Sequence, residues 1–228
     1  MAVTHSTRTI AGFTARCETI AVGADEIALW GVDDLERYVD RDALLRVDDP
    51  PEPPYWAHCW SGARVLATRV PPRASRVLEI GCGLGLPGVV AARRGARTLF
   101  VDRATAPLAF VRETLRTNGL EATGLVVADV LAAPWRGRFD LVLAAEVLYD
   151  RATFPALARA LADALAPRGR VLLADGHRID TTAFYDAATA AGLACERDEM
   201  RVIEEGCPAR VTIATLWRRW RKRIASSP

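Results

Sequence analysis

The chain of 228 residues is half hydrophobic and one quarter charged, with a mean hydropathy close to zero, which is ordinary globular composition. This length is enough for a substantial core in one large domain. The single lysine, Lys222, lies near the end of the chain, so neither a P-loop lysine nor a Schiff-base lysine has a candidate in the body. No serine lies in a GxSxG elbow, which argues against a serine hydrolase of the α/β type.

The formal net charge of +2 depends on the segment "RRWRKR" at 218–223, without which the chain is net acidic. A general polyanion-binding role is therefore not expected, and the basic tail predicts a solvated end in preference to a nucleic-acid clamp. The five cysteines are odd in number and contain no CxxC pair, which predicts reduced thiols without a zinc site. The three histidines lack the HExxH spacing, so no metal is expected.

The first 52 residues are predicted to form an N-terminal extension packed on the core. "MAVTHSTRTI" lacks the features of a secretory signal and no apolar run reaches 18 residues, so we expect a soluble, cytoplasmic protein. Residues 26–45 combine a short strand-like start with a helical, acidic stretch. The proline-rich 48–55, "DDPPEPPY", is typical of a loop that leads into the core.

Short apolar runs alternate with segments of helical period between residues 75 and 192. The expected strands are 76–81, 98–102, 124–129, 139–147 and 170–175, and the expected helices are 86–95, 106–119, 154–169 and 181–192. "TNG" (117–119) and "PRG" (167–169) are predicted to end two of these helices, and Pro87 suits a first turn. Such alternation predicts an α/β fold, a doubly wound, mostly parallel sheet with helices on both faces.

The pattern changes after Gly192. Residues 193–205 and 209–219 are predicted to form two long strands that are joined around "GCP" (206–208), as an antiparallel pair at one edge of the sheet. The predicted organisation is therefore an extension over 1–52, one domain over 53–217 and a basic tail over 218–228.

A glycine-rich turn follows the first predicted strand of the domain. In "VLEIGCGLGLPG" (77–88), Gly83 begins a literal GxGxxG, so a dinucleotide-binding loop has to be considered. That fingerprint starts directly after its strand, whereas here the strand ends at Gly81, two residues earlier. Counted from the strand end, the pattern is Glu79-x-Gly81-x-Gly83-x-Gly85, which resembles the nucleoside-binding loop of the class I methyltransferases that use S-adenosylmethionine.

Acidic residues end the next two predicted strands. Asp102 lies 21 residues after Gly81, where a carboxylate can accept hydrogen bonds from both ribose hydroxyls of either cofactor. Asp129 discriminates between the two cofactors. It has no counterpart in the dinucleotide fingerprint, and it matches the methyltransferase residue that faces the adenine amino group. Each acid taken singly is equally typical of a residue that caps a turn. Together, beside a glycine turn, they favour a ligand site.

Two further segments narrow the resemblance. "PPYWAHCWSGARVLA" (53–67) and Glu146-Val147-Leu148-Tyr149 are similar to motifs of the seven-β-strand family that includes protein lysine methyltransferases, and within it to the branch that methylates the electron transfer flavoprotein β subunit. The resemblance covers about 29–217. The chain departs from it at Ser61, which replaces a glycine, at Glu146, where aspartate is more common, and at His177, where that branch tends to have a small residue.

The resemblance implies an S-adenosylmethionine-dependent methyltransferase. It implies Glu146 and Tyr149 as catalytic residues and a set of cofactor-binding residues: Trp60, Glu79, Gly81, Cys82, Gly83, Asp102, Arg103, Asp129 and Val130. Trp56, four residues before Trp60, is expected to pack in the core. If the chain turns helically after its strand, Glu146 and Tyr149 lie on one side and together hold an acceptor lysine amine.

Three functions remain open from the sequence. The first is methylation of a protein lysine, the second is methylation of a small-molecule amine or other metabolite, and the third is cofactor binding without turnover. An NAD(P)-dependent enzyme is a less favoured alternative. The partners expected are accordingly a protein or a small amine, with neither nucleic acid nor membrane.

Overall fold

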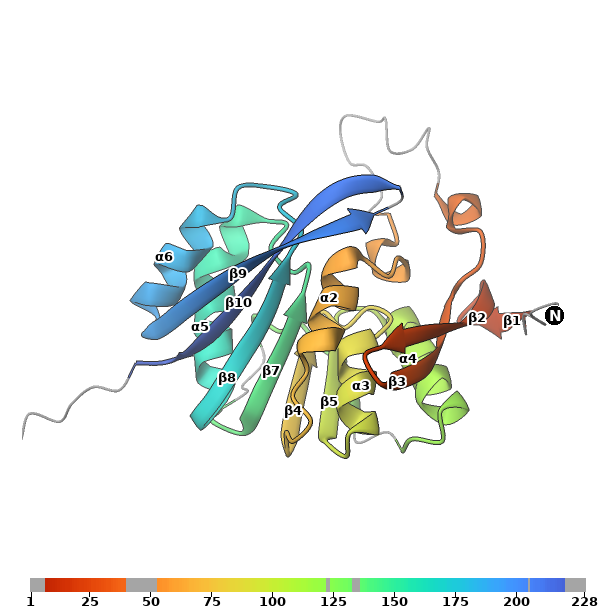
Figure 1. Ribbon diagram of the computed structural model, residues 1–228, viewed down its shortest axis with the longest axis horizontal. Helices are drawn as coiled ribbons and strands as arrows, with labels where there is room; N and C mark the ends of the chain where they lie inside the picture. Colours follow the sequence, from red (N-terminus) through yellow and green to blue (C-terminus); the bar gives the residue numbers. More distant parts are fainter. Residues whose placement is uncertain (1–6, 40–52, 122–123, 133–135, 205, 220–228) are drawn as a thin grey trace, which may run out of the picture.

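The computed structural model describes residues 7–39, 53–121, 124–132, 136–204 and 206–219 (Figure 1). Its elements follow in the order β1 (Thr7–Ile10), β2 (Phe13–Val22), β3 (Asp25–Val32), η1 (Leu35–Tyr38), η2 (Tyr55–Ala57), α2 (Ser61–Arg69), β4 (Arg76–Ile80), α3 (Leu86–Arg93), β5 (Arg97–Asp102), α4 (Thr105–Thr117), β6 (Gly124–Val127), β7 (Phe139–Ala145), η3 (Arg151–Thr153), α5 (Phe154–Ala164), β8 (Leu165–Asp175), α6 (Thr182–Ala190), β9 (Leu193–Glu204) and β10 (Cys207–Arg218). No helix in these described ranges is long and apolar enough to cross a membrane.

A seven-stranded sheet forms the centre of the protein, in the order β6-β5-β4-β7-β8-β10-β9. The strands β4 to β8 pair in parallel, and β10 runs antiparallel to both β8 and β9. The predicted doubly wound sheet with an antiparallel pair at one edge is confirmed. The chain leaves β4 toward β5 on one side and returns to β7 on the other, so a crevice opens at the carboxyl ends of β4 and β7.

Each parallel strand contributes to two hydrophobic clusters, because successive side chains point to opposite faces of the sheet. Val77 and Leu141 belong to the cluster under α2, α3 and α4, whereas Leu78 and Val142 belong to the cluster under α5 and α6. Figure 1 shows α5 and α6 together near β8, β9 and β10, whereas α2, α3 and α4 lie near β4 and β5. Burial on both faces explains why these strands are continuous apolar runs in the sequence.

A second sheet, β1-β2-β3, precedes the domain and was only partly predicted. The strand-like start of 26–45 is confirmed as part of β3, and the described part of the helical stretch forms the short 3-10 helix η1. Residues 40–52 lie outside the described residues, as does most of the predicted proline-rich loop. β1 and β2 were missed because their turn is Ala11-Gly12, both at positive φ, and not one of the more recognisable Asn-Gly or Asp-Gly pairs.

The small sheet is attached to α4 by hydrogen bonds from its last strand. The backbone N–H of Trp30 donates to Thr114 Oγ1 at 3.1 Å, and its indole N–H donates to Thr117 Oγ1 at 2.8 Å. Asn118 exchanges two hydrogen bonds with the backbone of Ala28. These contacts agree with an extension packed on the core, although the division into extension, domain and tail stays a prediction. Residues 220–228 of the tail lie outside the described residues.

One predicted boundary is wrong. "PRG" (167–169) does not end α5, which stops at Ala164, and it lies instead within β8, where the register with β7 shifts between Phe139 and Leu141. The predicted hairpin around "GCP" is confirmed, and β10 begins inside that segment, because Cys207 already pairs with Glu204. Gly119 follows the last turn of α4 with φ 66°, as "TNG" predicted.

Candidate functional site

The glycine loop joins β4 to α3 at the crevice between β4 and β7. Gly81, Gly83 and Gly85 have φ of 54°, 50° and 73°, a region that side chains disfavour. A Cβ at Gly81 would lie 3.1 Å from Val147 Cγ1, and one at Gly83 would lie 3.0 Å from the carbonyl oxygen of Trp56. The loop is therefore bounded by the segment after β7 and by the segment that leads into α2.

Glu79 is buried in β4, with 2% of its surface exposed. Its Oε2 accepts a hydrogen bond of 3.0 Å from the backbone N–H of Gly88 in the first turn of α3. Burial raises the pKa of Glu79 well above its ordinary value, against the effect of this hydrogen bond. The observed contact fixes the start of α3 relative to β4, and the predicted contact of Glu79 with the cofactor stays a prediction.

Gly88→Ala is expected to lower the free energy of unfolding by about 2 kcal/mol or more, because an added Cβ would overlap Glu79 Oε2 and the ring of Phe100. Chemical denaturation measures this change. Gly31→Ala is the matched control, since its Cβ would meet only Leu84 Cδ1 at an ordinary 3.7 Å. Equal stability of the two variants would contradict the packing of this loop.

Asp102 ends β5 beside the glycine loop and is 7% exposed. Its Oδ2 accepts from the backbone N–H of Gly83 at 3.0 Å, and its Oδ1 accepts from that of Ala104 at 3.1 Å. A carboxylate has about four acceptor positions, so each oxygen keeps one after these two bonds. The structure thus places a carboxylate with spare acceptor capacity at the loop.

The other predicted cofactor residues differ in their surroundings. Asp129 lies two residues beyond β6, and its Oδ1 accepts from the backbone N–H of Leu131 at 2.9 Å, which is the turn-capping role considered above. Cys82 is buried in the glycine loop, and this burial raises the pKa of its thiol well above the ordinary value. Arg103 is exposed and Val130 is half-buried. The part that each plays toward a cofactor stays a prediction.

Glu146 follows β7 in a left-handed conformation, with φ 56°. Its side chain is 9% exposed and lies between two glycine backbones: Gly62 N donates to Oε1 and Gly176 N donates to Oε2, both at 3.2 Å. A Cβ on Gly62 would overlap this carboxylate, and one on Gly176 would lie 2.8 Å from Oε1. Burial raises the pKa of Glu146, although the Arg178 guanidinium and the Gly176 N–H oppose that effect. Strained backbone around a buried carboxylate is typical of a functional site.

Trp60 lies next to this carboxylate, together with two charged residues that the sequence analysis did not select. The guanidinium carbon of Arg178 is 3.9 Å from the centre of the Trp60 ring. Arg178 Nε is 3.5 Å from Glu146 Oε2, and its Nη2 is 3.6 Å from Glu204 Oε2. Neither Arg178 nor Glu204 has a local sequence signal, because they follow β8 and end β9, far apart in the chain.

Tyr149 is 59% exposed at the surface beyond Glu146. The helical turn that would have placed both side chains on one side does not form, since residues 147–150 have no regular structure and Leu148 is buried. The Glu146 backbone instead bonds to the carbonyl of Ala174 on β8. Helical spacing therefore does not bring Glu146 and Tyr149 together, and their joint action on an acceptor stays a prediction.

Trp56 packs in the core, as predicted. Its ring lies 5.3 Å from that of Phe13 and 5.4 Å from that of Phe110. It thereby joins the β1-β2-β3 sheet to α4 and holds the segment that covers the glycine loop.

Comparison with known proteins identifies the family. A family model described as a methyltransferase domain matches residues 77–169. The protein N-lysine methyltransferase METTL21A of Xenopus tropicalis is 30% identical over 146 residues, which are 56% of this chain and 67% of that protein. The chain belongs to the class I S-adenosylmethionine-dependent methyltransferases.

Other relatives of this class I chain differ in their acceptors. METTL21A of Danio rerio is 33% identical over 45% of this chain and 52% of its own length, and the ubiquinone biosynthesis O-methyltransferase of Stutzerimonas stutzeri is 33% identical over 45% of each. The chain spans about half the length of these two relatives. The structure of a TehB-like methyltransferase from Corynebacterium glutamicum has a TM-score of 0.55 and 19% identity, covering 68% of this chain and 86% of that one, which shows the fold.

Family membership decides between the two cofactors that the glycine pattern left open, in favour of S-adenosylmethionine. The residues present fit this group. Asp102 is held against Gly83 of the glycine loop, and its carboxylate keeps acceptor positions for a diol.

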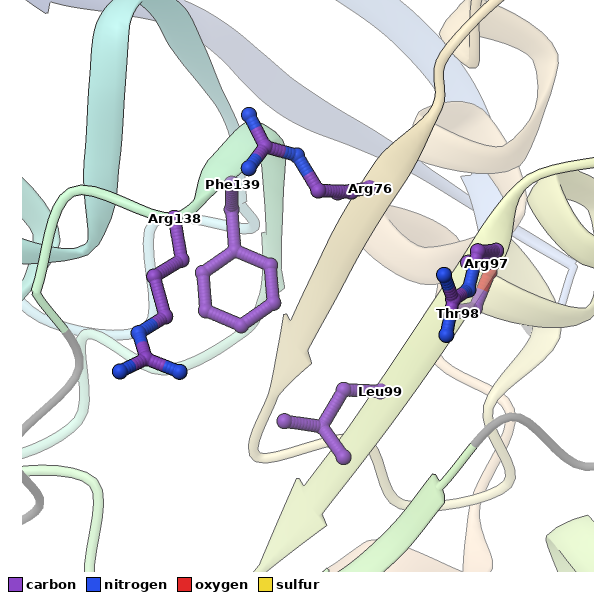
Figure 2. A pocket seen from close by; sticks show the side chains of 6 residues that line it. All are labelled: Arg76, Arg97, Thr98, Leu99, Arg138 and Phe139. Carbon is purple, nitrogen blue, oxygen red and sulfur yellow. The ribbon is translucent and has the colours of Figure 1, made fainter.

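A separate pocket of about 510 Å³ lies at the other end of the class I sheet (Figure 2). It is lined by Arg76, Arg97, Thr98, Leu99, Arg138 and Phe139, at the amino-terminal ends of β4, β5 and β7. Arg76 is paired there with Asp140 at 2.9 Å. This pocket is not part of the cofactor crevice, which opens at the carboxyl ends of the same strands. Among the described residues, no three His, Cys, Asp or Glu side chains are placed to hold a metal ion.

Proposed function

We propose that this chain is a methyltransferase that transfers a methyl group from S-adenosylmethionine to the side-chain amine of a protein lysine. The observation that carries the proposal is the position of Glu146, a buried carboxylate beside Trp60. Its neighbour Val147 lies against Gly81 of the cofactor loop, so the carboxylate adjoins the place where the methyl group would be presented.

The cofactor side of the site follows from the contacts of β4, β5 and β6. Asp102 would accept from the two ribose hydroxyls while it holds Gly83, and Asp129 would face the adenine from the next strand end. Gly81 and Gly83 would supply a backbone that carries no side chain, and Cys82, whose side chain is buried, would contribute its backbone between them. Glu79 would act by fixing the loop to α3 through its bond to Gly88.

The sulfonium cofactor would supply an already activated methyl group, so the acceptor side has one proton to move: the lysine ammonium would lose a proton to Glu146 before its nitrogen displaces the methyl group from sulfur. Glu146 would hold the incoming amine by a charge-assisted hydrogen bond and direct its lone pair toward that group. The two glycine N–H groups fix the Glu146 carboxylate, so little reorganisation is needed. Tyr149, exposed at the rim, would contact the acceptor as it enters.

Methylation of a metabolite is the second candidate, because ubiquinone biosynthesis O-methyltransferases are about as similar to this chain as the lysine methyltransferases are. Binding of the cofactor without turnover is a third. The buried Glu146 carboxylate favours an amine over a phenol, because a protonated amine can take the place of the Arg178 charge beside it and a phenol cannot.

Incubation of the protein with methyl-labelled S-adenosylmethionine and a cell lysate separates these functions. We expect label in a discrete protein band, released by acid hydrolysis as methylated lysine. Label in small molecules alone would favour the metabolite, and cofactor binding without any transfer would favour the non-catalytic protein. Absence of S-adenosylmethionine binding in calorimetry would contradict all three.

A cytoplasmic location and the absence of nucleic-acid or membrane partners are part of this proposal. The five cysteines, all unpaired, support a reducing compartment.

A further inference from the structure

Two carboxylates from distant strands meet at the start of α2. Glu204, at the end of β9, accepts from the backbone N–H of Ser61 at 3.0 Å, and Glu146, after β7, accepts from that of Gly62 at 3.2 Å. The first N–H groups of a helix have no partners within it, so both carboxylates are held there by hydrogen bonds and by the helix dipole. They form two sides of a cluster that Trp60, directly before α2, completes.

The side chain of Arg178 lies inside this cluster. Its guanidinium covers the Trp60 ring at 3.9 Å and faces Glu146 and Glu204 at 3.5 and 3.6 Å. An aromatic face together with carboxylates is the environment that a protonated or methylated amine prefers. The group of Trp60, Glu146 and Glu204 therefore has the chemistry of an ammonium site, and an arginine of the same chain lies in it.

The contacts of Arg178 are those of a displaceable occupant. Its distances to the two carboxylates exceed the roughly 2.7–2.9 Å of well-formed charge-assisted hydrogen bonds. Its side chain is 38% exposed, so a path to solvent exists. Glu146 and Glu204, in contrast, keep their backbone hydrogen bonds to α2 whether or not Arg178 is present.

We propose that Trp60, Glu146 and Glu204 form the subsite for the ammonium group of the acceptor, and that Arg178 occupies this subsite until a cationic acceptor displaces it. This inference rests on the proposed function, because it concerns the acceptor of that same site. It makes Arg178 a specificity-determining residue.

The charge balance of the subsite determines which acceptors can displace Arg178. A neutral or anionic acceptor that displaced Arg178 would leave the Glu146 carboxylate, which is nine-tenths buried, without the guanidinium that offsets its charge, and such a loss is strongly unfavourable. An ammonium group replaces the lost charge. The resident arginine also lowers the apparent affinity for the acceptor, which equals the intrinsic affinity multiplied by the fraction of time during which the subsite is free.

Binding of n-propylammonium to Arg178→Met tests the proposal without any methyl transfer. Calorimetry in the presence of S-adenosylhomocysteine is expected to give an affinity about tenfold higher than that of the wild type, if Arg178 occupies the subsite about nine-tenths of the time. Methionine keeps the apolar stem without the charge.

Three variants provide the controls. Arg210→Met removes an arginine that faces Glu199 at the same 3.6 Å but lies on the β9–β10 hairpin away from Trp60, and it should leave propylammonium binding unchanged. The double variant Trp60→Leu with Arg178→Met should lose the higher propylammonium affinity expected for Arg178→Met alone. Arg178→Lys should be intermediate, because an ammonium cannot stack flat and reach two carboxylates at once, and it serves if Arg178→Met does not fold.

An unchanged propylammonium affinity in Arg178→Met and Arg178→Lys would overturn the proposal. So would binding of propionate by the wild type that is lost in Arg178→Met, because Arg178 would then be an anion site. If the protein methylates lysine and the Arg178 variants methylate it equally well, only the proposed displacement of Arg178 is overturned. Tighter propylammonium binding in a protein that transfers no methyl group would overturn only the proposed function.

Discussion

Replacing Asp102 with alanine is expected to weaken S-adenosylmethionine binding by about a hundredfold or more. The reason is that the ribose diol would lose two hydrogen bonds to an ionised group, each contributing about 1.5–3 kcal/mol. The glycine loop would also lose the acceptor that holds Gly83. Calorimetry with S-adenosylmethionine and S-adenosylhomocysteine measures the change, and both ligands should be affected alike because they share the nucleoside.

The control for Asp102→Ala is Asp140→Ala. Asp140 also belongs to the parallel sheet, but it pairs with Arg76 at the opposite end. Its loss should leave cofactor affinity unchanged. Thermal unfolding of Asp102→Ala separates weak binding from a misfolded loop, because Gly83 and Ala104 lose their acceptors in that variant. A cofactor affinity within threefold of the wild type in a folded variant would refute the ribose assignment.

Replacing Glu146 with glutamine is expected to slow methyl transfer by about 10²–10⁴-fold while cofactor affinity is retained, since a neutral amide cannot hold the amine as a carboxylate does. Labelling first identifies the acceptor, and single-turnover methyl transfer to that acceptor then measures this rate. Glutamine preserves the size of the side chain between Gly62 and Gly176. A loss of cofactor binding equal to the loss in rate would show that Glu146 acts on the cofactor side.

The pH dependence of the same variant gives a second measurement. Burial raises the pKa of Glu146, so its ionised form appears at higher pH than for an ordinary glutamate. The wild-type rate should fall as pH falls through this raised pKa, and Glu146→Gln should lack that part of the profile. Glu199→Gln is the control, because Glu199 lies half-exposed on β9 beside Arg210, and its rate profile should match the wild type.

The fold was predictable in most of its parts because the signals are local. The strands and helices from β4 to β10 follow from apolar runs, helical periods and glycine turns, each within about fifteen residues of chain. The boundary at "PRG" was wrong because pairing with β7 extends β8 beyond its local pattern, and pairing with β9 likewise begins β10 within "GCP". The β1–β2 hairpin was missed because its Ala-Gly turn and mixed side chains lack a strong local preference.

The placement of the predicted cofactor-binding residues was largely determined by the sequence alone. The glycines, Glu79, Asp102 and Asp129 occur at fixed distances from strand ends, and the carboxyl ends of neighbouring parallel strands necessarily meet at one edge. Only the tertiary structure decided which residues surround Glu146. Glu146, Arg178 and Glu204 meet at the start of α2 although they follow or end three different strands, β7, β8 and β9. Their chemistry depends on mutual distance and burial, and no pattern within a single segment encodes either.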